Sequence, residues 1–389
     1  MKCNLSDICD FRKGKVEVEN LNTKNYISTE NMLSNKSGIT DASSLPNVSL
    51  TQEYKNGDVL VSNIRPYFKK IWQARYDGGC SNDVLVFVPK SNTDSDFLYY
   101  VLADDAFFTY SMATSKGTKM PRGDKTSIMQ YAVPMVDFFT QKKIASILKS
   151  LDEKIELNNA INENLEQQYI AVIDNFLNQL NSYRKCSLSD VADCQNGRAF
   201  YKEGYDDSGA FVIDLGNVNT SGNFIFTNSD KYISIDKYNN PKLERYRVYK
   251  DDLVMVMTDR KSTMDILGKV GKIYKDGYYI LNQRMYRIRA KDGINTNYLY
   301  ACLNSTEVCN ALKERALGSV QKYVNTGDIN GIILKIPNSV EMDHIANVLD
   351  PIFQNMENNI MENESLIELR NMLLPKLMSG ELDVSELDI

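Results

Sequence analysis

The chain has 389 residues with 45 Lys or Arg and 51 Asp or Glu, so its formal net charge is −6. This length suffices for two or three domains that each bury a core, and no apolar run approaches the roughly 18 residues needed to span a bilayer. The seven cysteines include no Cys-x-x-Cys pair, so neither a disulfide framework nor a zinc site is indicated. These features exclude a membrane protein and a disulfide-stapled secreted protein, and the start lacks a signal-peptide apolar segment. We therefore expect a cytoplasmic chain.

Residues 1–140 are expected to form a first domain of mixed α/β structure. Residues 84–88 are β-branched and aromatic, which predicts a strand, and residues 97–110 are predicted to be helical. Asn56-Gly57-Asp58 is a turn signal.

Residues 141–182 are expected to form a long helix. Apolar side chains recur there at alternating intervals of 4 and 3 residues, which is a heptad seam. Asn158 and Asn162 occupy two seam positions, where asparagine lowers stability and serves mainly to fix register and partner. The other seam positions are Ile144, Leu148, Leu151, Ile155, Leu165, Tyr169, Val172 and Phe176.

Residues 183–340 repeat the first domain with different side chains. Leu5-Ser6-Asp7-Ile8 returns as Leu188-Ser189-Asp190-Val191, and most matches after residue 97 keep an offset of 201. Strands are predicted at 253–257, 278–281 and 286–289, and a helix at 296–312. A shared scaffold that carries two different specificities explains this pattern, although duplicated domains also diverge without functional meaning.

Residues 341–380 repeat the long helix, and residues 381–389 form an acidic tail. The seam asparagines return 201 residues later as Asn359 and Asn363. We therefore expect the two helices to pair as an antiparallel coiled coil, with Asn158 opposite Asn363 and Asn162 opposite Asn359.

Two prolines limit this second helix. Pro351 is expected to kink or restart it, and Pro375 to end or bend it near Leu374.

The charges are unevenly distributed. Residues 141–180 hold 4 basic and 6 acidic side chains and residues 341–389 hold 2 and 11, whereas residues 181–340 hold 23 and 18. A DNA-binding protein needs local positive surface, because phosphate contacts supply most of the affinity. The globular parts meet this condition better than the helices, although a surplus of five charges is also ordinary scatter.

Several segments resemble a known family. The stretches 141–145 and 151–158, and the ending 373–382, resemble the conserved helices of the specificity subunit of type I restriction-modification enzymes. Asn56-Gly57-Asp58-Val59-Leu60, residues 62–66, and Gly318-Ser319 leading to Ile329 look like that family's target recognition domains. The resemblance covers essentially the whole chain. It implies an α+β fold with two mixed α/β target recognition domains, each followed by a long helix.

The resemblance implies a DNA sequence-recognition subunit that catalyses nothing. In this family each domain reads one half of a split site in double-stranded DNA, and the paired helices space the domains and dock two modification subunits. Those partners bind S-adenosylmethionine and methylate adenine, and restriction or translocase subunits can join them. The sequence agrees, because it lacks an Asn/Asp-Pro-Pro-aromatic tetrapeptide and a glycine-rich cofactor loop. We expect neither a cofactor nor a metal ion on this chain itself.

The candidates for DNA contact lie beside aromatic side chains, in basic loops and their counterparts in the repeat, or, for Arg287 and Arg289, on one face of a predicted strand. The loops 116–122 and 318–323 occupy equivalent places in the repeat with dissimilar side chains, as two different readers would need. Arginine can contact guanine bidentately, although an exposed arginine is more often merely solvated. The candidates are Arg65, Lys69, Lys70, Lys116, Lys119 and Arg122 in the first domain, and Arg260, Lys261, Arg287, Arg289, Gln321, Lys322 and Tyr323 in the second.

Three alternatives remain open at this point. A specificity subunit of a type IIB enzyme or a phage-exclusion complex would carry the same motifs, and neighbouring genes would distinguish it. A coiled-coil scaffold that binds only protein would show no salt-dependent affinity for DNA. A fused methyltransferase or nuclease would be active alone, but its motifs are missing.

Overall fold

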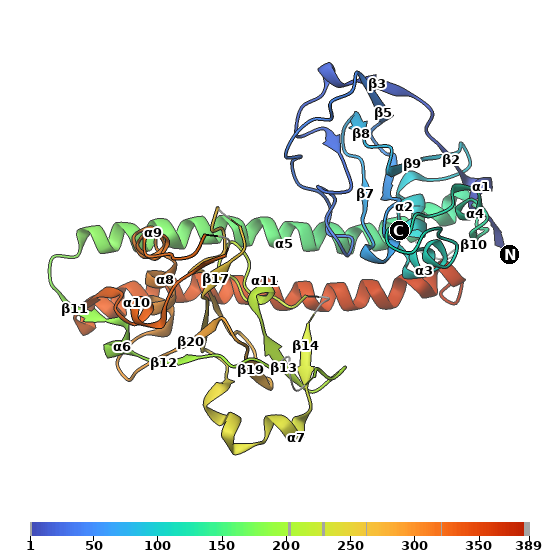
Figure 1. Cartoon of the computed structure of the whole chain (residues 1–389). Helices are drawn as coiled ribbons and strands as arrows, with labels where there is room; N and C mark the ends of the chain where they lie inside the picture. Colours follow the sequence, from blue (N-terminus) through green and yellow to red (C-terminus); the bar gives the residue numbers. More distant parts are fainter. Residues whose placement is uncertain (1, 201–203, 228–229, 262, 320, 385–389) are drawn as a thin grey trace. The chain divides into compact units, whose positions relative to one another are not determined.

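The chain divides into two compact units. The computed structural model describes residues 2–200, 204–227, 230–261, 263–319 and 321–384. The first unit comprises residues 1–156 and 363–389, and the second comprises residues 157–362. Two long helices, α5 (Phe138–Gln179) and α11 (Ser339–Ser379), each contribute residues to both units. Figure 1 shows these helices with the smaller elements of each domain labelled.

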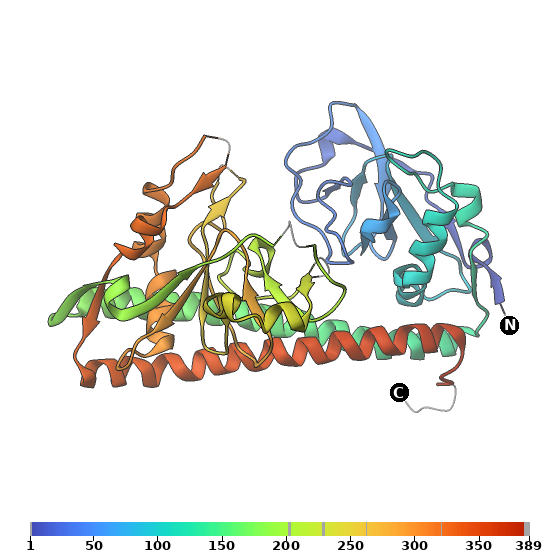
Figure 2. The same cartoon turned by 60° about the horizontal axis from the view of Figure 1, so that its bottom comes forward.

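The two long helices are antiparallel, as the sequence predicts. Within the first unit, Ile144 of α5 shares a core with Leu377 of α11. Within the second unit, Tyr169 of α5 shares a core with Leu349 of α11. The start of α5 therefore packs on the end of α11, and the end of α5 packs on the start of α11, which can be followed in Figures 1 and 2.

The seam is polar at the predicted asparagines. The Asn359 amide donates a hydrogen bond to the side-chain oxygen of Asn162 at 2.8 Å, which confirms this predicted layer. Asn158 donates to the Glu362 carboxylate at 2.7 Å. The predicted layer of Asn158 and Asn363 stays a prediction.

Helix α11 continues through both of its prolines. The helix neither ends at Pro375 nor restarts at Pro351, so these two alternatives are wrong. A bend at Pro375 and a kink at Pro351 stay predictions. Both prolines lie on the exposed face. The carbonyls that lose their N–H donors, those of Asn347 and Asn371, belong to exposed residues and can bind water instead.

The domain of the first unit is built on two four-stranded sheets, ordered β2-β9-β6-β7 and β3-β5-β8-β4. The first sheet is antiparallel throughout, and the second contains one parallel pair, β4 with β8. The strands are β2 (Cys9–Phe11), β3 (Lys15–Glu17), β4 (Tyr26–Ile27), β5 (Leu50–Tyr54), β6 (Val59–Ser62), β7 (Ile71–Gln73), β8 (Gly78–Cys80) and β9 (Val84–Pro89).

The domain of the second unit has the corresponding sheets, ordered β12-β20-β16-β18 and β14-β13-β19-β15. Here the parallel pair is β13 with β19. The strands are β12 (Ala192–Asn196), β13 (Ala210–Ile213), β14 (Lys231–Ile233), β15 (Arg247–Val248), β16 (Leu253–Val256), β18 (Val270–Lys272), β19 (Tyr279–Leu281) and β20 (Met285–Ala290).

The helix predicted at 97–110 is two helices, α2 (Ser95–Ala103) and α3 (Asp105–Ala113). The helix predicted at 296–312 is likewise two, α8 (Thr296–Asn304) and α9 (Thr306–Glu314). Asp104 and Ser305 are extended at the breaks, and each side chain accepts an N–H of the helix that follows. Capping therefore overrides an apolar pattern that continues across the break. The remaining helices are α1 (Leu5–Ile8), α4 (Lys125–Ile128), α6 (Leu188–Val191), α7 (Ile235–Tyr238), α10 (Thr326–Asn330), and the 3-10 turns η1 (Val18–Asn20), η2 (Pro66–Phe68), η3 (Leu215–Asn217) and η4 (Pro241–Tyr246).

Each domain is fastened to the start of the long helix that follows it in sequence. Strand β1 (Lys2–Asn4) pairs with β10 (Ala132–Pro134), which precedes α5, and β11 (Tyr183–Ser187) pairs with β22 (Ile333–Pro337), which precedes α11. The Leu5 N–H donates to the Tyr131 carbonyl at 2.8 Å, and the Leu188 N–H donates to the Ile332 carbonyl at 2.9 Å. The repeat seen in the sequence is thus a repeat of hydrogen bonds. None of the described helices is long and apolar enough to cross a membrane.

Candidate nucleic-acid interface

The basic loop of the first domain is closed by its own backbone. Lys116 and Arg122 exchange two N–H···O hydrogen bonds, at 2.9 and 3.0 Å. Gly117 turns the chain between them with a φ of +92°, a left-handed conformation that favours glycine. The tip, residues 117–120, is exposed. The loop therefore presents Lys119 to solvent on a fixed base.

Two other segments hold this loop in place. The Arg65 N–H donates to the Pro121 carbonyl at 2.8 Å, and the Gly123 N–H donates to the Asn63 carbonyl at 3.2 Å. The Asn63 N–H in turn donates to the Asp83 carbonyl at 2.8 Å. Residues 62–66, 81–84 and 115–123 thus form one hydrogen-bonded assembly, which we call the first frame.

The second domain builds the same assembly. Leu317 and Tyr323 exchange two N–H···O hydrogen bonds, at 2.9 and 3.0 Å, and Gly318 has a φ of +91°. Strand β17 (Thr258–Asp259) pairs with β21 (Lys322–Tyr323) where the first domain has the Arg65 to Pro121 bond.

The supporting segments also correspond. The Val324 N–H donates to the Met257 carbonyl and the Met257 N–H donates to the Arg284 carbonyl, each at 3.0 Å. Residues 256–260, 282–285, 316–319 and 321–324 form what we call the second frame.

The side chains on the two frames differ where their backbones match. Arg65 in the first frame corresponds to Asp259 in the second, and Asp83 corresponds to Arg284, so the charges are exchanged. Arg122 likewise corresponds to Tyr323. A common backbone with dissimilar side chains is the arrangement that two readers of different sequences require.

Four of the basic candidates in the first domain are occupied by protein partners. The Lys116 amine pairs with Asp124 at 2.5 Å, Arg122 pairs with Asp83 at 3.1 Å, and Lys69 pairs with Asp105 at 2.8 Å. The Lys70 amine donates to the Thr29 carbonyl at 2.6 Å, and burial lowers its pKa. These four are held in place by their partners, which restricts their reach toward a ligand.

Within the described residues, the side chains of Lys119 and Arg65 have no hydrogen-bond or ion-pair partner. The Arg65 Nε is buried and unsatisfied, and its backbone is left-handed with a φ of +52°. Tyr67 and Phe68, the two residues after Pro66, are exposed and pack on each other with ring centroids 4.7 Å apart. An arginine without a protein partner, followed in sequence by two exposed aromatic rings, suits contact with nucleic acid.

In the second domain Arg260 and Lys322 carry charges with no partner among the described residues, and Gln321 and Tyr323 lie beside Lys322 in the same loop. Lys261 instead pairs with Asp265 at 3.1 Å.

Arg287 and Arg289 are engaged inside the domain. Arg287 is 6% exposed, donates to the carbonyls of Arg245 and Arg247 at 3.1 and 2.9 Å, and has its pKa lowered by burial. Arg289 donates two hydrogen bonds to the buried Asp252 carboxylate, at 2.6 and 2.7 Å. Both arginines tie strand β20 to neighbouring segments, and their predicted contact with DNA stays a prediction.

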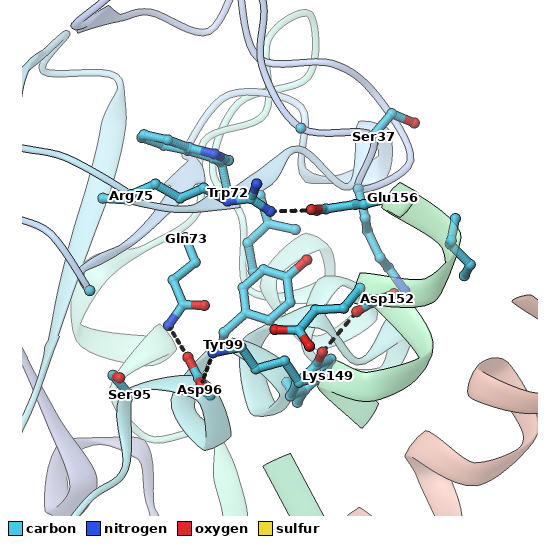
Figure 3. Close-up of a pocket in the computed structure, with 18 of the residues that line it drawn as sticks. Ser37, Trp72, Gln73, Arg75, Ser95, Asp96, Tyr99, Lys149, Asp152 and Glu156 are labelled. Carbon is cyan, nitrogen blue, oxygen red and sulfur yellow. Dashed lines mark hydrogen bonds and ion pairs between the residues drawn. The ribbon is translucent and has the colours of Figure 1, made fainter. Parts of the chain in front are cut away.

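A hollow of the first unit is lined by no residue of the first frame and has a balanced charge. Its volume is about 860 Å³, and it lies where the domain meets α5 and α11 (Figure 3). Arg75 pairs with Glu156, Lys149 with Asp96 at 2.6 Å, and the seam residue Arg370 with Asp152 at 2.5 Å. Because these cations and carboxylates neutralise each other, the hollow is not a phosphate site.

The described residues contain no candidate metal site beside the two frames. Within the described ranges, no group of three or more His, Cys, Asp or Glu side chains could hold a metal ion. The sequence reasoning missed Asp83 and Arg284, which complete the two frames. Neither belongs to a basic cluster, and only the preceding Asn82 and Gln283 give a polar turn signal.

Both halves of the chain match a family of known proteins. The family model of the type I restriction modification DNA specificity domain matches residues 1–167 and again residues 182–369. The HindI specificity subunit of Haemophilus influenzae is 24% identical over 92% of this chain and 94% of its own length. The MjaVIII specificity subunit of Methanocaldococcus jannaschii is 23% identical over 80% of this chain and 76% of its own length.

A solved structure shares the fold. The type I restriction-modification S subunit from M. genitalium superposes with a TM-score of 0.56, at 15% identity, over 99% of this chain and 96% of its own. The family model covers both halves of the chain, and the chain therefore belongs to the type I restriction-modification DNA specificity family.

Proposed function

We propose that this chain is the DNA sequence-recognition subunit of a type I restriction-modification complex, in which each domain reads one half of a split site in double-stranded DNA. The observation that carries this proposal is the pair of frames. Two loops with the same closing hydrogen bonds and the same left-handed glycine present different side chains. Matching backbones give both domains the same approach to a duplex, and different side chains give them different sequences to recognise.

The long helices are proposed to set the spacing of the half-sites and to dock the partners. Helices α5 and α11 each contribute residues to both units, so we propose that their length sets the distance between the two half-sites. We propose two modification subunits as partners, because the chain contains two equivalent halves. Restriction or translocase subunits are further proposed members of the complex, and we propose that it acts in the cytoplasm.

The chain itself is proposed to be non-catalytic. Adenine methylation would be supplied by the modification subunits, which would bind S-adenosylmethionine, and this chain would bind no cofactor. What supports this is the missing base-binding tetrapeptide and cofactor loop in the sequence.

Methyl transfer with and without a partner tests the proposal. The purified chain should transfer no methyl group to DNA, and co-expression with a modification subunit that co-purifies with it should give methylation at a split motif. A matched variant, Lys119→Ala with Lys322→Ala, should still co-purify with the partner but methylate less. Methylation by the chain alone would overturn the proposal, as would a partner-dependent motif that is not split.

A further inference from the structure

The second unit contains a polar hollow at the centre of the second frame. Its volume is about 310 Å³, and its walls include residues from 256–260, 282–285 and 321–324 of the second frame. Amide, hydroxyl and guanidinium groups dominate the lining, which includes Asn196, Thr258, Gln283, Arg284, Asn325 and Thr326. This is a lining of hydrogen-bonding groups, with the single charge of Arg284.

The turn that carries Gln283 and Arg284 is held on both sides. The Met285 N–H donates to the Asn282 carbonyl at 3.3 Å and closes the turn. The Gly197 N–H donates to the Met285 carbonyl at 3.0 Å. A Cβ at Gly197 would lie 1.7 Å from the Asn282 oxygen, so the end of β12 approaches the turn as closely as only glycine allows.

Arg284 has an unusual backbone and a free side chain. Its φ is +73°, a left-handed conformation that costs free energy in any residue except glycine. Such residues persist where the surroundings hold them, and they concentrate at functional sites. The Arg284 side chain is exposed and has no hydrogen-bond or ion-pair partner among the described residues. The fold thus accepts strain to place an unpaired guanidinium at the hollow.

The groups around the hollow separate into two roles. Asn196 donates to the Thr326 hydroxyl at 2.9 Å, which fixes one wall. Arg260 lies two residues after the wall residue Thr258, and Lys322 directly precedes the wall residue Tyr323. Neither side chain has a hydrogen-bond or ion-pair partner among the described residues, so both are available to bind phosphate. Phosphate contacts position a protein on the duplex, and contacts in the groove specify the sequence.

We propose that this hollow receives the major-groove edge of a G·C pair in the second half-site, with Arg284 donating to the guanine O6 and N7. The two parallel N–H groups of a guanidinium match these two acceptors. In the first frame the equivalent residue is Asp83, which accepts hydrogen bonds and is already paired with Arg122. The two frames therefore cannot read the same base at this position. This inference rests on the proposed function of the chain.

The test is methylome sequencing of cells that carry the modification subunit with Arg284→Gln. Glutamine keeps polarity but cannot donate the bidentate pair, so the preference for one guanine in one half-site should fall by about 5- to 150-fold. The other half-site should be unchanged. The matched control Arg260→Ala should lower methylation of all sites together, because a phosphate contact carries no base preference.

A second variant guards against a folding defect. Arg284→Gly removes the side chain and relieves the left-handed strain, so this variant should fold at least as well. It should lose the same guanine preference at the same position of the half-site. The inference is overturned if either variant keeps the wild-type preference at every base, or if both lower methylation uniformly as Arg260→Ala does. A wild-type complex without any split motif would overturn the proposed function itself, which separates the two failures.

Discussion

The side-chain amide of Asn359 donates a hydrogen bond to the side-chain oxygen of Asn162 at 2.8 Å, and both residues occupy seam positions of the paired helices. Asn162 also donates to the Met356 carbonyl at 3.2 Å. The Asn162 amide group is therefore used as both donor and acceptor across the seam. A sliding of one helix by a heptad would separate these partners and leave buried polar groups unsatisfied.

Replacement of Asn162 by alanine should lower the free energy of unfolding by about 1–3 kcal/mol, because the Asn359 amide and the Met356 carbonyl lose a partner. The double variant Asn162→Leu with Asn359→Leu should regain most of this loss, because an apolar pair leaves fewer unmet groups. Urea denaturation followed by circular dichroism measures both. An alanine variant as stable as the wild type would show that the layer of Asn162 and Asn359 does not stabilise the helix pair.

Lys119→Ala should weaken binding of the assembled complex to DNA and reduce the slope of log affinity against log salt by about 0.9 for one lost phosphate contact. Lys322→Ala should do the same in the second domain. Lys261→Ala is the matched control, because Lys261 already pairs with Asp265, and it should change the slope less. DNA-binding titrations of the complex at two salt concentrations measure these slopes. Equal slopes for all three variants would contradict phosphate contacts by Lys119 and Lys322.

The pKa of Asp124 should depend on its partner Lys116 in the first frame. A hydrogen bond from Lys116, followed by two from Ser127, lowers the pKa of the Asp124 carboxyl to about 2, against an ordinary 3.8. Ionised Asp124 therefore stabilises the folded chain above about pH 4, and this contribution is lost as the pH falls toward 2.

The variant Lys116→Met should raise the pKa of Asp124 while leaving it below the ordinary value, because the Ser127 donors remain. Titration of the carboxyl by NMR measures this shift. Lys119 lies in the same loop but has no partner among the residues that the structure describes, so Lys119→Met should leave the pKa of Asp124 unchanged. An equal shift in both variants would contradict the role of Lys116.

Arg289→Ala should destabilise the second domain by about 3 kcal/mol, the lower end of the range for breaking a buried ion pair, because Arg289 itself is partly exposed. It would leave the Asp252 carboxylate, 3% exposed at its side chain, without its arginine. Adding Asp252→Asn should restore part of the stability. Thermal unfolding of the single and double variants checks this, and a single variant with wild-type stability would free Arg289 for a role at DNA.

The long helices could be predicted from sequence because their stability comes from a periodic seam that local reasoning detects. The breaks at Asp104 and Ser305 could not, because a capping side chain ended helices whose apolar pattern continues. The course of α11 through Pro351 also escaped prediction, since it depends on which face meets solvent.

The site was predicted in part for similar reasons. Loops with basic tips are visible as sequence, and Lys119 and Lys322 lie in them. Whether an arginine is free depends on distant partners, and the Asp252 that holds Arg289 lies 37 residues away. Arg284 stands alone between Gln283 and Met285, so only the fold shows that it lines a hollow.

We propose that α5 and α11 hold the two DNA-reading domains at a fixed spacing. Inserting one heptad after Glu156 and another after Glu362, where the chain passes between its units, keeps each seam face in place. At ~1.5 Å per residue each helix grows by roughly 10 Å, which is about three base pairs at ~3.4 Å each.

Methylome sequencing of cells that carry this variant and the modification subunit is the most direct test. Both half-sites should keep their sequence while the unspecified gap lengthens by about three base pairs, or methylation should fall because the added pairs also rotate one half-site around the duplex. A fully active complex that methylates sites with the original gap would contradict the proposal that α5 and α11 set the spacing.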